Sequence, residues 1–159
     1  MIDWRPGKEI FMQVKPAQRC VVVGVDGSPN SIAALRRAAR EARSRHARLD
    51  VVHVPDPKAA GLPRPLRTFR EWLRLRSLVA DNLDRSQHLT TRLRILYGDP
   101  GPVLAEQAAR GELLVIGARE HSEHGSPFGG HTVPVVRSRA TCEVIICADH
   151  HADSGIDIE

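Results

Sequence analysis

Five short apolar runs, each separated from the next by a stretch of helical periodicity, constrain the fold of this chain more than any other feature. Three of the runs are nearly continuous in Val, Ile and Leu, as expected for strands that are covered on both faces. In the first intervening segment, apolar or small residues recur at spacings of three and four, and Ser28 followed by Pro29 is typical of a helix start. Strands are therefore predicted at 20–25, 49–54, 93–97, 113–117 and 144–148, with helices at 28–46, 66–88, 102–110 and 132–139.

Strands that alternate with helices predict right-handed crossovers and a parallel sheet between two helical layers. With 159 residues, of which 42% are hydrophobic and 26% charged, the chain has the length and composition of one globular domain. We therefore expect an α/β fold, a single three-layer domain with a five-stranded parallel sheet over residues 19–148. Residues 1–18 are expected to form a flexible N-terminal extension, and residues 149–159 an acidic C-terminal tail.

The cysteines and the length of the apolar runs indicate in which cellular compartment the protein is expected. Cys20, Cys142 and Cys147 are an odd number of cysteines without a C-x-x-C pair, which is typical of reduced thiols. No apolar stretch approaches the ~18 residues of a membrane span. We expect a cytoplasmic protein with no membrane partner, with Cys142 and Cys147 buried in the core or in a dimer interface. Phe69 and Trp72 are expected to be packing groups of the second helix.

The net charge of +4 is unevenly distributed along the chain. Residues 31–97 hold 14 Arg and one Lys against six acidic residues, which gives +9 and leaves −5 for the remainder. Arginines of the first two predicted helices are able to contact phosphate backbones, but they are equally typical of solvated outer helix faces. Since no nucleic-acid-binding motif accompanies them, we expect outer-face arginines and no specific nucleic acid partner.

Two segments carry candidate ligand-binding residues, because ligands of an open parallel sheet bind beyond the carboxyl ends of the strands. Asp26 directly follows the first run, and its carboxylate can accept from ribose hydroxyls or simply support the start of the next helix. Gly117 ends the fourth run and opens a loop rich in glycine and histidine, 117–132. The backbone N–H groups of such a loop suit a phosphate, although glycine also serves in ordinary turns.

The order and spacing of these motifs resemble the universal stress protein family over nearly the whole chain. CVVVGVDGSPNS is similar to the family's first strand and turn, LDVVHV to its second strand, and YGDPGPVLAEQAARGELLVIGAR to the segment through its fourth strand. The family's nucleotide signature is G-x-x-G, nine residues, then G-[S/T], and Gly117 and Gly130 lie at its first and third glycines. The resemblance implies a flavodoxin-like, adenine-nucleotide alpha-hydrolase-like fold with strand order 3-2-1-4-5, and a homodimer made through the last strand.

The resemblance also implies roles for individual residues. Asp26 matches the acidic residue near the ribose and adenine, and Val54 matches the position whose backbone meets adenine, with Val25 beside it. Gly117 and Gly130 match two glycines of the phosphate loop. The cofactor that the resemblance implies is ATP, with Mg²⁺ bound only together with the nucleotide.

Two positions depart from the family's signature. Glu120 stands where the second glycine would be, and His131 replaces the Ser or Thr that holds phosphate. A carboxylate about 5 Å from a phosphate charge, at an effective dielectric of about 20, costs roughly 3 kcal/mol, or about a hundredfold in affinity. Arg119, a protonated His131 or Mg²⁺ can offset this charge. We therefore interpret the chain as a non-catalytic regulatory module of the stress response with a degraded ATP site.

Two alternatives stay open at this point. One is a weak ATPase or metal-assisted hydrolase that uses the loop 119–131, whose His121, His124 and His131 accompany Glu120 and Glu123. A solvated polar loop has the same composition and needs no metal. The other alternative is an interaction protein in which the dimer surface functions without nucleotide.

Overall fold

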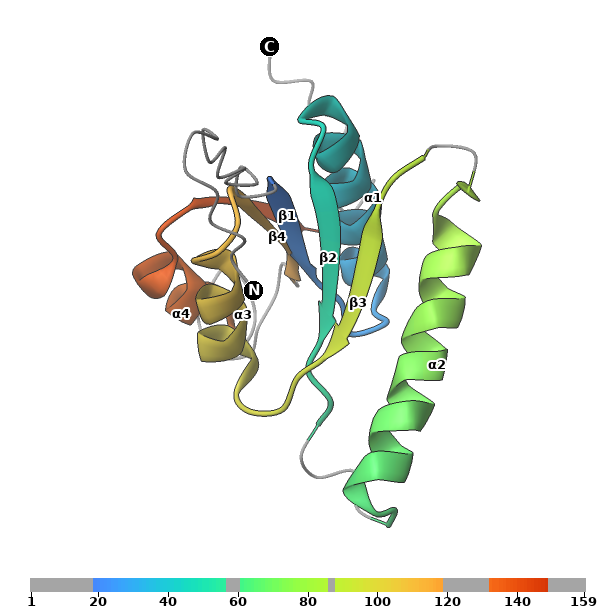
Figure 1. Cartoon of the computed structure of the whole chain (residues 1–159). Helices are drawn as coiled ribbons and strands as arrows, with labels where there is room; N and C mark the ends of the chain where they lie inside the picture. The colour runs from blue at the N-terminus through green and yellow to red at the C-terminus, as the bar shows by residue number, and fades with distance from the viewer. Residues whose placement is uncertain (1–18, 57–60, 86–87, 119–131, 149–159) are drawn as a thin grey trace, which may run out of the picture.

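The computed structural model describes residues 19–56, 61–85, 88–118 and 132–148. Over this part of the chain, strands and helices alternate (Figure 1). The alternation predicted from the apolar runs is therefore confirmed. The elements are β1 (Cys20–Gly24), α1 (Pro29–Ser44), β2 (Arg48–His53), α2 (Arg64–Asn82), β3 (Thr91–Ile95), α3 (Pro100–Ala108), β4 (Leu113–Ala118), α4 (Thr132–Arg139) and β5 (Glu143–Ala148).

All neighbouring strands pair in parallel, in the order β3-β2-β1-β4-β5 that the family resemblance implied. The order reverses between β1 and β4, whose register places Gly24 beside Ile116. The carboxyl ends of these two strands therefore form the topological switch point, where ligands of such sheets bind.

Helices cover both faces of the sheet, α1 and α2 on one face and α3 and α4 on the other (Figure 1). Alternate residues of β1 point to opposite faces: Val21 and Val23 join the core beneath α1, and Val22 joins the core beneath α3 and α4. Burial of each such valine contributes about 1.5–3 kcal/mol relative to an exposed side chain. The sheet is thus covered on both faces, as its apolar runs predicted.

α1 begins where the sequence indicated. Ser28 is the N-cap, since its Oγ accepts a hydrogen bond from the Ser31 N–H at 3.3 Å, and a proline occupies the first turn. The side chains of α1 that face the sheet are small; Ala34, Ala38 and Ala42 are fully buried. These alanines allow α1 to lie close over β1 and β4.

The boundaries around α2 and β3 differ from the prediction. α2 ends at Asn82 and not near residue 88, because Leu83 is extended (φ −116°, ψ 135°). Farther along the chain, His88 adopts a left-handed conformation (φ 48°), which a helix would not contain. β3 and α3 each begin two residues earlier than predicted, at residues 91 and 100. Apolar spacing did not reveal the end of α2, since Leu83 and Leu89 still pack against the core beyond it.

α2 presents one apolar row to the sheet and a second to the outside. Leu75 is buried, and Leu78 and Val79 pack against the same core. The prediction that Phe69 is a packing group is wrong, since Phe69 is 60% exposed, whereas Trp72 is partly buried. Leu75 follows Phe69 by six positions, so a rotation of about 100° per residue places the two side chains on different sides of the helix.

Within the described residues, no helix combines the length and the apolar character needed to cross a bilayer.

A buried thiol and an ion pair lie near the amino ends of β1 and β2. The Arg48 guanidinium donates two hydrogen bonds to the Asp50 carboxylate, Nε–Oδ1 at 2.7 Å and Nη2–Oδ2 at 3.0 Å. Cys20 is 5% exposed, and burial, together with the neighbouring Asp50, raises the pKa of its thiol to about 11. The thiol is therefore protonated and unreactive at neutral pH.

We expect the free energy of unfolding to fall as the pH rises from 9 to 11. The unfolded thiol of Cys20 ionises near pH 9, whereas the folded thiol keeps its proton up to about 11. Stability that is present below pH 9 is thus lost over this interval, by at most about 1.4 kcal/mol per pH unit. Denaturant melts should show this slope for Cys20 but not for Cys20→Val, both in a background where Cys142 and Cys147 are replaced by Ala. Equal slopes would contradict the assignment.

Candidate functional site

The turn between β1 and α1 exposes Asp26 at the carboxyl edge of the sheet. The Asp26 carboxylate accepts a hydrogen bond from the Ser28 N–H at 2.8 Å, and its own N–H donates to the Ser31 hydroxyl at 3.3 Å. Gly27 has φ 87°, a conformation that favours glycine. Of the two roles considered for Asp26, the structure therefore shows support of the helix start, while contact with a ribose stays a prediction.

Val25 has both of its backbone polar groups engaged within the protein. Its N–H donates to the Val52 carbonyl at 2.9 Å, and its carbonyl accepts from Nδ1 of His53 at 2.7 Å. The side chain is 5% exposed and belongs to the core beneath α1. The backbone of Val25, which directly precedes Asp26, is therefore held in place by hydrogen bonds to β2.

His53 connects the backbone of Val25 to α2. Its Nε2 lies 3.3 Å from Oε2 of Glu71, and both side chains are largely buried, at 18% and 12% exposed. The Glu71 carboxylate also contacts Nη1 of Arg74 at 3.3 Å and Nη2 of Arg70 at 3.8 Å. The network thus runs from the carbonyl at the end of β1 through the last residue of β2 to the arginines of α2.

A cavity of about 260 Å³ lies beside this network at the carboxyl edge of the sheet. Arg74 also lines this cavity. This differs from our expectation that the arginines of the first two helices lie on outer faces, away from the strand ends. The sequence offered a weak signal for the network, namely a histidine that interrupts the apolar run LDVVHV. The lining residues are Val25, Asp26, Gly27, His53, Glu71, Arg74, Leu75 and Leu78.

Two further arginines lie near the end of β3. Arg64 and Arg67 place their guanidinium groups 4.4 and 5.4 Å from the centre of the Tyr97 ring. The Thr68 hydroxyl forms a short hydrogen bond with the Tyr97 hydroxyl; this bond and the nearby arginines lower the pKa of Tyr97. The first turns of α2 therefore bring positive charge to the same edge of the sheet as Asp26.

Gly117 is required by packing at the switch point. A Cβ at this position would lie 2.5 Å from the carbonyl carbon of Asn30 and 2.6 Å from its oxygen, which is closer than real Cβ contacts allow. The Asn30 side chain, 4% exposed, donates from Nδ2 to the Ala118 carbonyl at 2.7 Å, and its Oδ1 has no hydrogen-bond partner among the described residues. The end of β4 and the first turn of α1 are thus held in direct contact.

The structure brings together part of the predicted site. Val25 and Asp26 line one cavity. Val54 is partly buried and packs against the core beneath α3 and α4, and Gly117 lies in β4 at the same edge of the sheet. The remaining predicted site residues, Arg119, Gly130 and His131, lie outside the described residues, as do Glu120, His121, Glu123 and His124. Among the residues that the structure describes, no group of three or more His, Cys, Asp or Glu could hold a metal ion.

In a doubly wound α/β domain of this strand order, ligands bind at the switch point, and the exposed carboxylate of Asp26 lies there. The model of the universal stress protein family matches residues 19–148. The chain belongs to the universal stress protein family.

Individual relatives agree with this assignment. A universal stress protein of Mycobacterium tuberculosis (strain H37Rv) is 28% identical over 151 residues, which covers 87% of this chain and 50% of the relative. The chain thus spans about half the length of the curated relatives that it matches.

Solved structures share the fold. A universal stress protein in complex with cAMP is 24% identical with a TM-score of 0.62, over 82% of this chain and 97% of that one. The universal stress protein of Archaeoglobus fulgidus in complex with dAMP is 23% identical with a TM-score of 0.55, over 81% and 96% of the two chains. At these identities the likeness establishes the fold.

Gly117→Ala is expected to lower the free energy of unfolding by about 2–3 kcal/mol, because its Cβ would displace the backbone of α1. Gly27→Ala is the matched control: it has no atom within 4 Å of the added Cβ and should cost only about 1 kcal/mol for its positive φ. Denaturant melts of the two variants measure the difference. A cost for Gly117→Ala no larger than that for Gly27→Ala would show that α1 and β4 are not in close contact.

His53 and Glu71 are expected to be coupled energetically. His53→Phe leaves the Val25 carbonyl without its donor and should cost about 2 kcal/mol of stability. In a double-mutant cycle with Glu71→Gln, the coupling energy should be about 1 kcal/mol. Additive effects of the two substitutions would indicate that the two side chains do not interact.

Proposed function

We propose that this chain binds an adenine nucleotide at the carboxyl ends of β1 and β4 and acts as a regulatory module rather than as an enzyme. The observation that carries the proposal is the exposed Asp26, held at the switch point by the β1–α1 turn. A carboxylate in this position accepts hydrogen bonds from ribose hydroxyls. Relatives of the same fold that bind cAMP and dAMP support the choice of an adenine nucleotide.

We propose further that nucleotides with a single phosphate bind better than ATP. Glu120 stands where the family's signature has glycine, and each phosphate charge about 5 Å from a carboxylate costs roughly 3 kcal/mol at an effective dielectric of about 20. A triphosphate carries more negative charge than AMP or cAMP does, so a carboxylate at this position of the signature should disfavour ATP most. In this proposal, Mg²⁺ accompanies the nucleotide only when a triphosphate is bound, because the ion then bridges the phosphate and the Glu120 carboxylate.

Calorimetry on nucleotide-free protein tests both parts of the proposal. AMP or cAMP should bind, and ATP with Mg²⁺ should bind at least about tenfold more weakly than the tighter of the two. Asp26→Asn should weaken AMP binding by about tenfold, whereas Asp81→Asn, an exposed carboxylate on α2, should leave it unchanged. Glu120→Gly should strengthen ATP binding by up to about a hundredfold.

Two results would contradict the proposal in different ways. Absence of heat with AMP, cAMP and ATP alike would refute nucleotide binding and favour an interaction protein that works without nucleotide. Binding of ATP by the unchanged protein below about 10 μM would refute the weak-ATP part while leaving an adenine-nucleotide site in place.

We also propose a homodimer formed through β5 in the cytoplasm. β5 lies at the edge of the sheet, next to β4, and its residues Val144, Ile145, Ile146 and Cys147 are only partly buried in the single chain. A second copy would cover them. Sedimentation of the unchanged protein and of Ile146→Asp should show a dimer and a monomer, and a monomer in both would refute this interface.

A further inference from the structure

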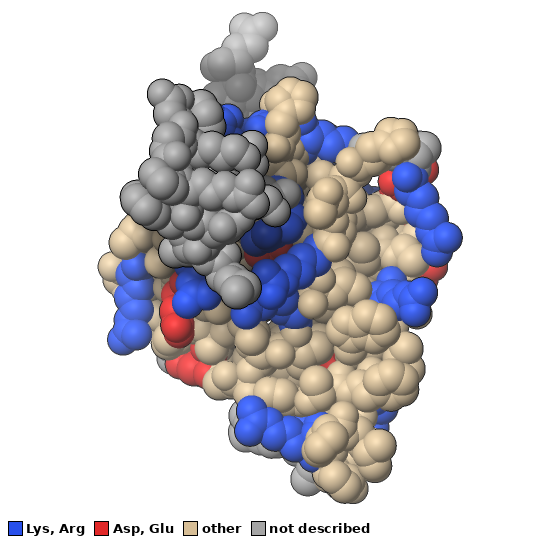
Figure 2. Space-filling view, in the orientation of Figure 1, with Lys and Arg blue, Asp and Glu red and all other residues tan. Residues whose placement is uncertain are grey.

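The outer face of α2 carries a row of exposed apolar side chains. Leu62, just before the helix, and Leu66, Phe69 and Leu73 within it are 42%, 56%, 60% and 41% exposed. Their spacing is four, three and four residues. We call these four residues the α2 seam. In the space-filling view, uncharged surface covers the part of the molecule where the lower half of α2 lies, with arginines at its margins (Figure 2).

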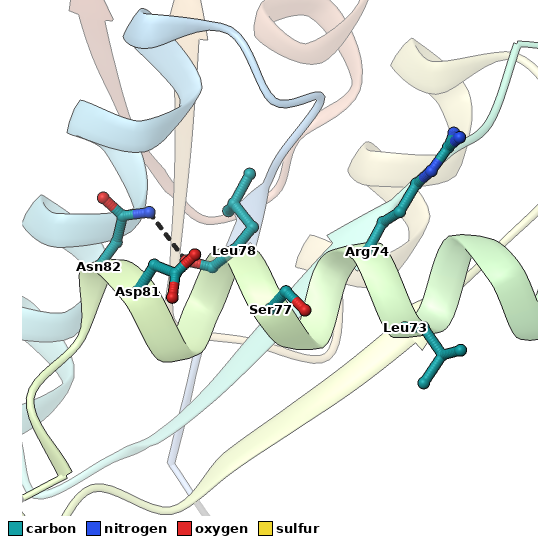
Figure 3. A pocket seen from close by; sticks show the side chains of 6 residues that line it. All are labelled: Leu73, Arg74, Ser77, Leu78, Asp81 and Asn82. Atoms are coloured by element: carbon teal, nitrogen blue, oxygen red, sulfur yellow. Dashed lines mark hydrogen bonds between the residues drawn. The ribbon is translucent and has the colours of Figure 1, made fainter.

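The α2 seam lies opposite the face with which α2 contacts the sheet. With about 100° of rotation per residue, Leu66, Phe69 and Leu73 fall within roughly 60° of one another and point away from Leu75. Figure 3 shows the same division, with Leu73 and Leu78 on opposite sides of the helix. The fold therefore does not need the α2 seam for its own core.

The width of the α2 seam indicates what kind of surface would cover it. A helix that lies on a membrane buries a broad apolar face in the lipid, whereas a narrow row at alternating spacings of four and three is the pattern of a helix–helix contact. An open groove of about 470 Å³ runs beside Leu73 and gives a partner's side chains room next to the row. Leu73, Arg74, Ser77, Leu78, Asp81 and Asn82 line this groove (Figure 3).

Positive charge borders the α2 seam. Arg70 and Arg74 lie along one side, with side chains 43% and 66% exposed, and Arg76 lies exposed along the other. Glu71 neutralises part of this charge, but its side chain is turned inward and is 12% exposed. Asp81, farther along the helix, is the exposed acidic residue of the groove.

This charge argues against a second copy of the chain as the occupant. Two α2 helices in contact would bring the arginines of one copy against those of the other, and like charges across an interface are unfavourable. An amphipathic helix whose apolar row is bordered by Asp and Glu would complement both the shape and the charge.

We propose that the α2 seam is a docking surface for an acidic amphipathic helix of a partner protein. The proposal does not rest on nucleotide binding. Of the residues that carry it, Arg74 also lines the cavity at Asp26, whereas Phe69 and Arg76, which are varied below, lie outside that cavity.

Synthetic helical peptides of about three heptads, with Leu at both core positions, test the proposal by fluorescence anisotropy. One peptide carries Glu beside the core positions and the other carries Lys. The acidic peptide should bind, and the basic peptide should bind at least about tenfold more weakly. Phe69→Asp and Arg76→Glu should each weaken binding of the acidic peptide by about tenfold or more. Arg40→Glu, an exposed arginine on α1, is the matched control and should have no such effect.

Because Phe69 and Arg76 are exposed, the variants should keep the thermal melting curve of the unchanged protein, measured by circular dichroism. Absence of binding, equal binding of the two peptides, or unchanged binding by Phe69→Asp would overturn the proposal. Binding to vesicles of equal amounts of phosphatidylcholine and phosphatidylglycerol that Phe69→Asp abolishes would overturn it in favour of a lipid surface. Self-association that Phe69→Asp abolishes would overturn it in favour of a second copy.

Discussion

The contact between the end of β4 and the first turn of α1 is the constraint on which the carboxyl edge of the sheet at the switch point depends. Gly117 has no room for a side chain because the backbone of Asn30 lies against it, and the Asn30 amide ties the Ala118 carbonyl to α1. The same turn of α1 is capped by Ser28, which also donates its N–H to Asp26. The first turn of α1 therefore determines both the packing at the switch point and the position of the Asp26 carboxylate.

Gly117 has two independent reasons to be glycine. The family's signature assigns it to a phosphate loop, and the structure shows that a methyl group there would collide with α1. The second reason holds whether or not a phosphate is bound. A glycine at this position is thus weaker support for nucleotide binding than Asp26, whose carboxylate lies exposed at the switch point.

The fold was predictable from the sequence because apolar runs, three of them nearly continuous in Val, Ile and Leu, alternate with segments of helical period. This pattern can be read without knowing any contact between elements. The start of α1 was predictable from Ser28 and Pro29, since capping is a local interaction. The network of His53, Glu71 and Arg74 was not predicted, because it joins two elements whose relative placement depends on the packing of α2. Phe69 was misassigned because apolar composition does not reveal which side of a helix faces the core.

The central claim is that an adenine nucleotide binds at the carboxyl ends of β1 and β4, above the support formed by Val25 and His53. Amide chemical-shift changes in ¹H–¹⁵N correlation spectra, recorded on titration with AMP, test this most directly. The account predicts that the largest changes fall on the amides of residues 25–28, 30–31, 54 and 117–118, with little change along the outer face of α2. Changes spread over other faces of the sheet, or no change at saturating AMP, would contradict it.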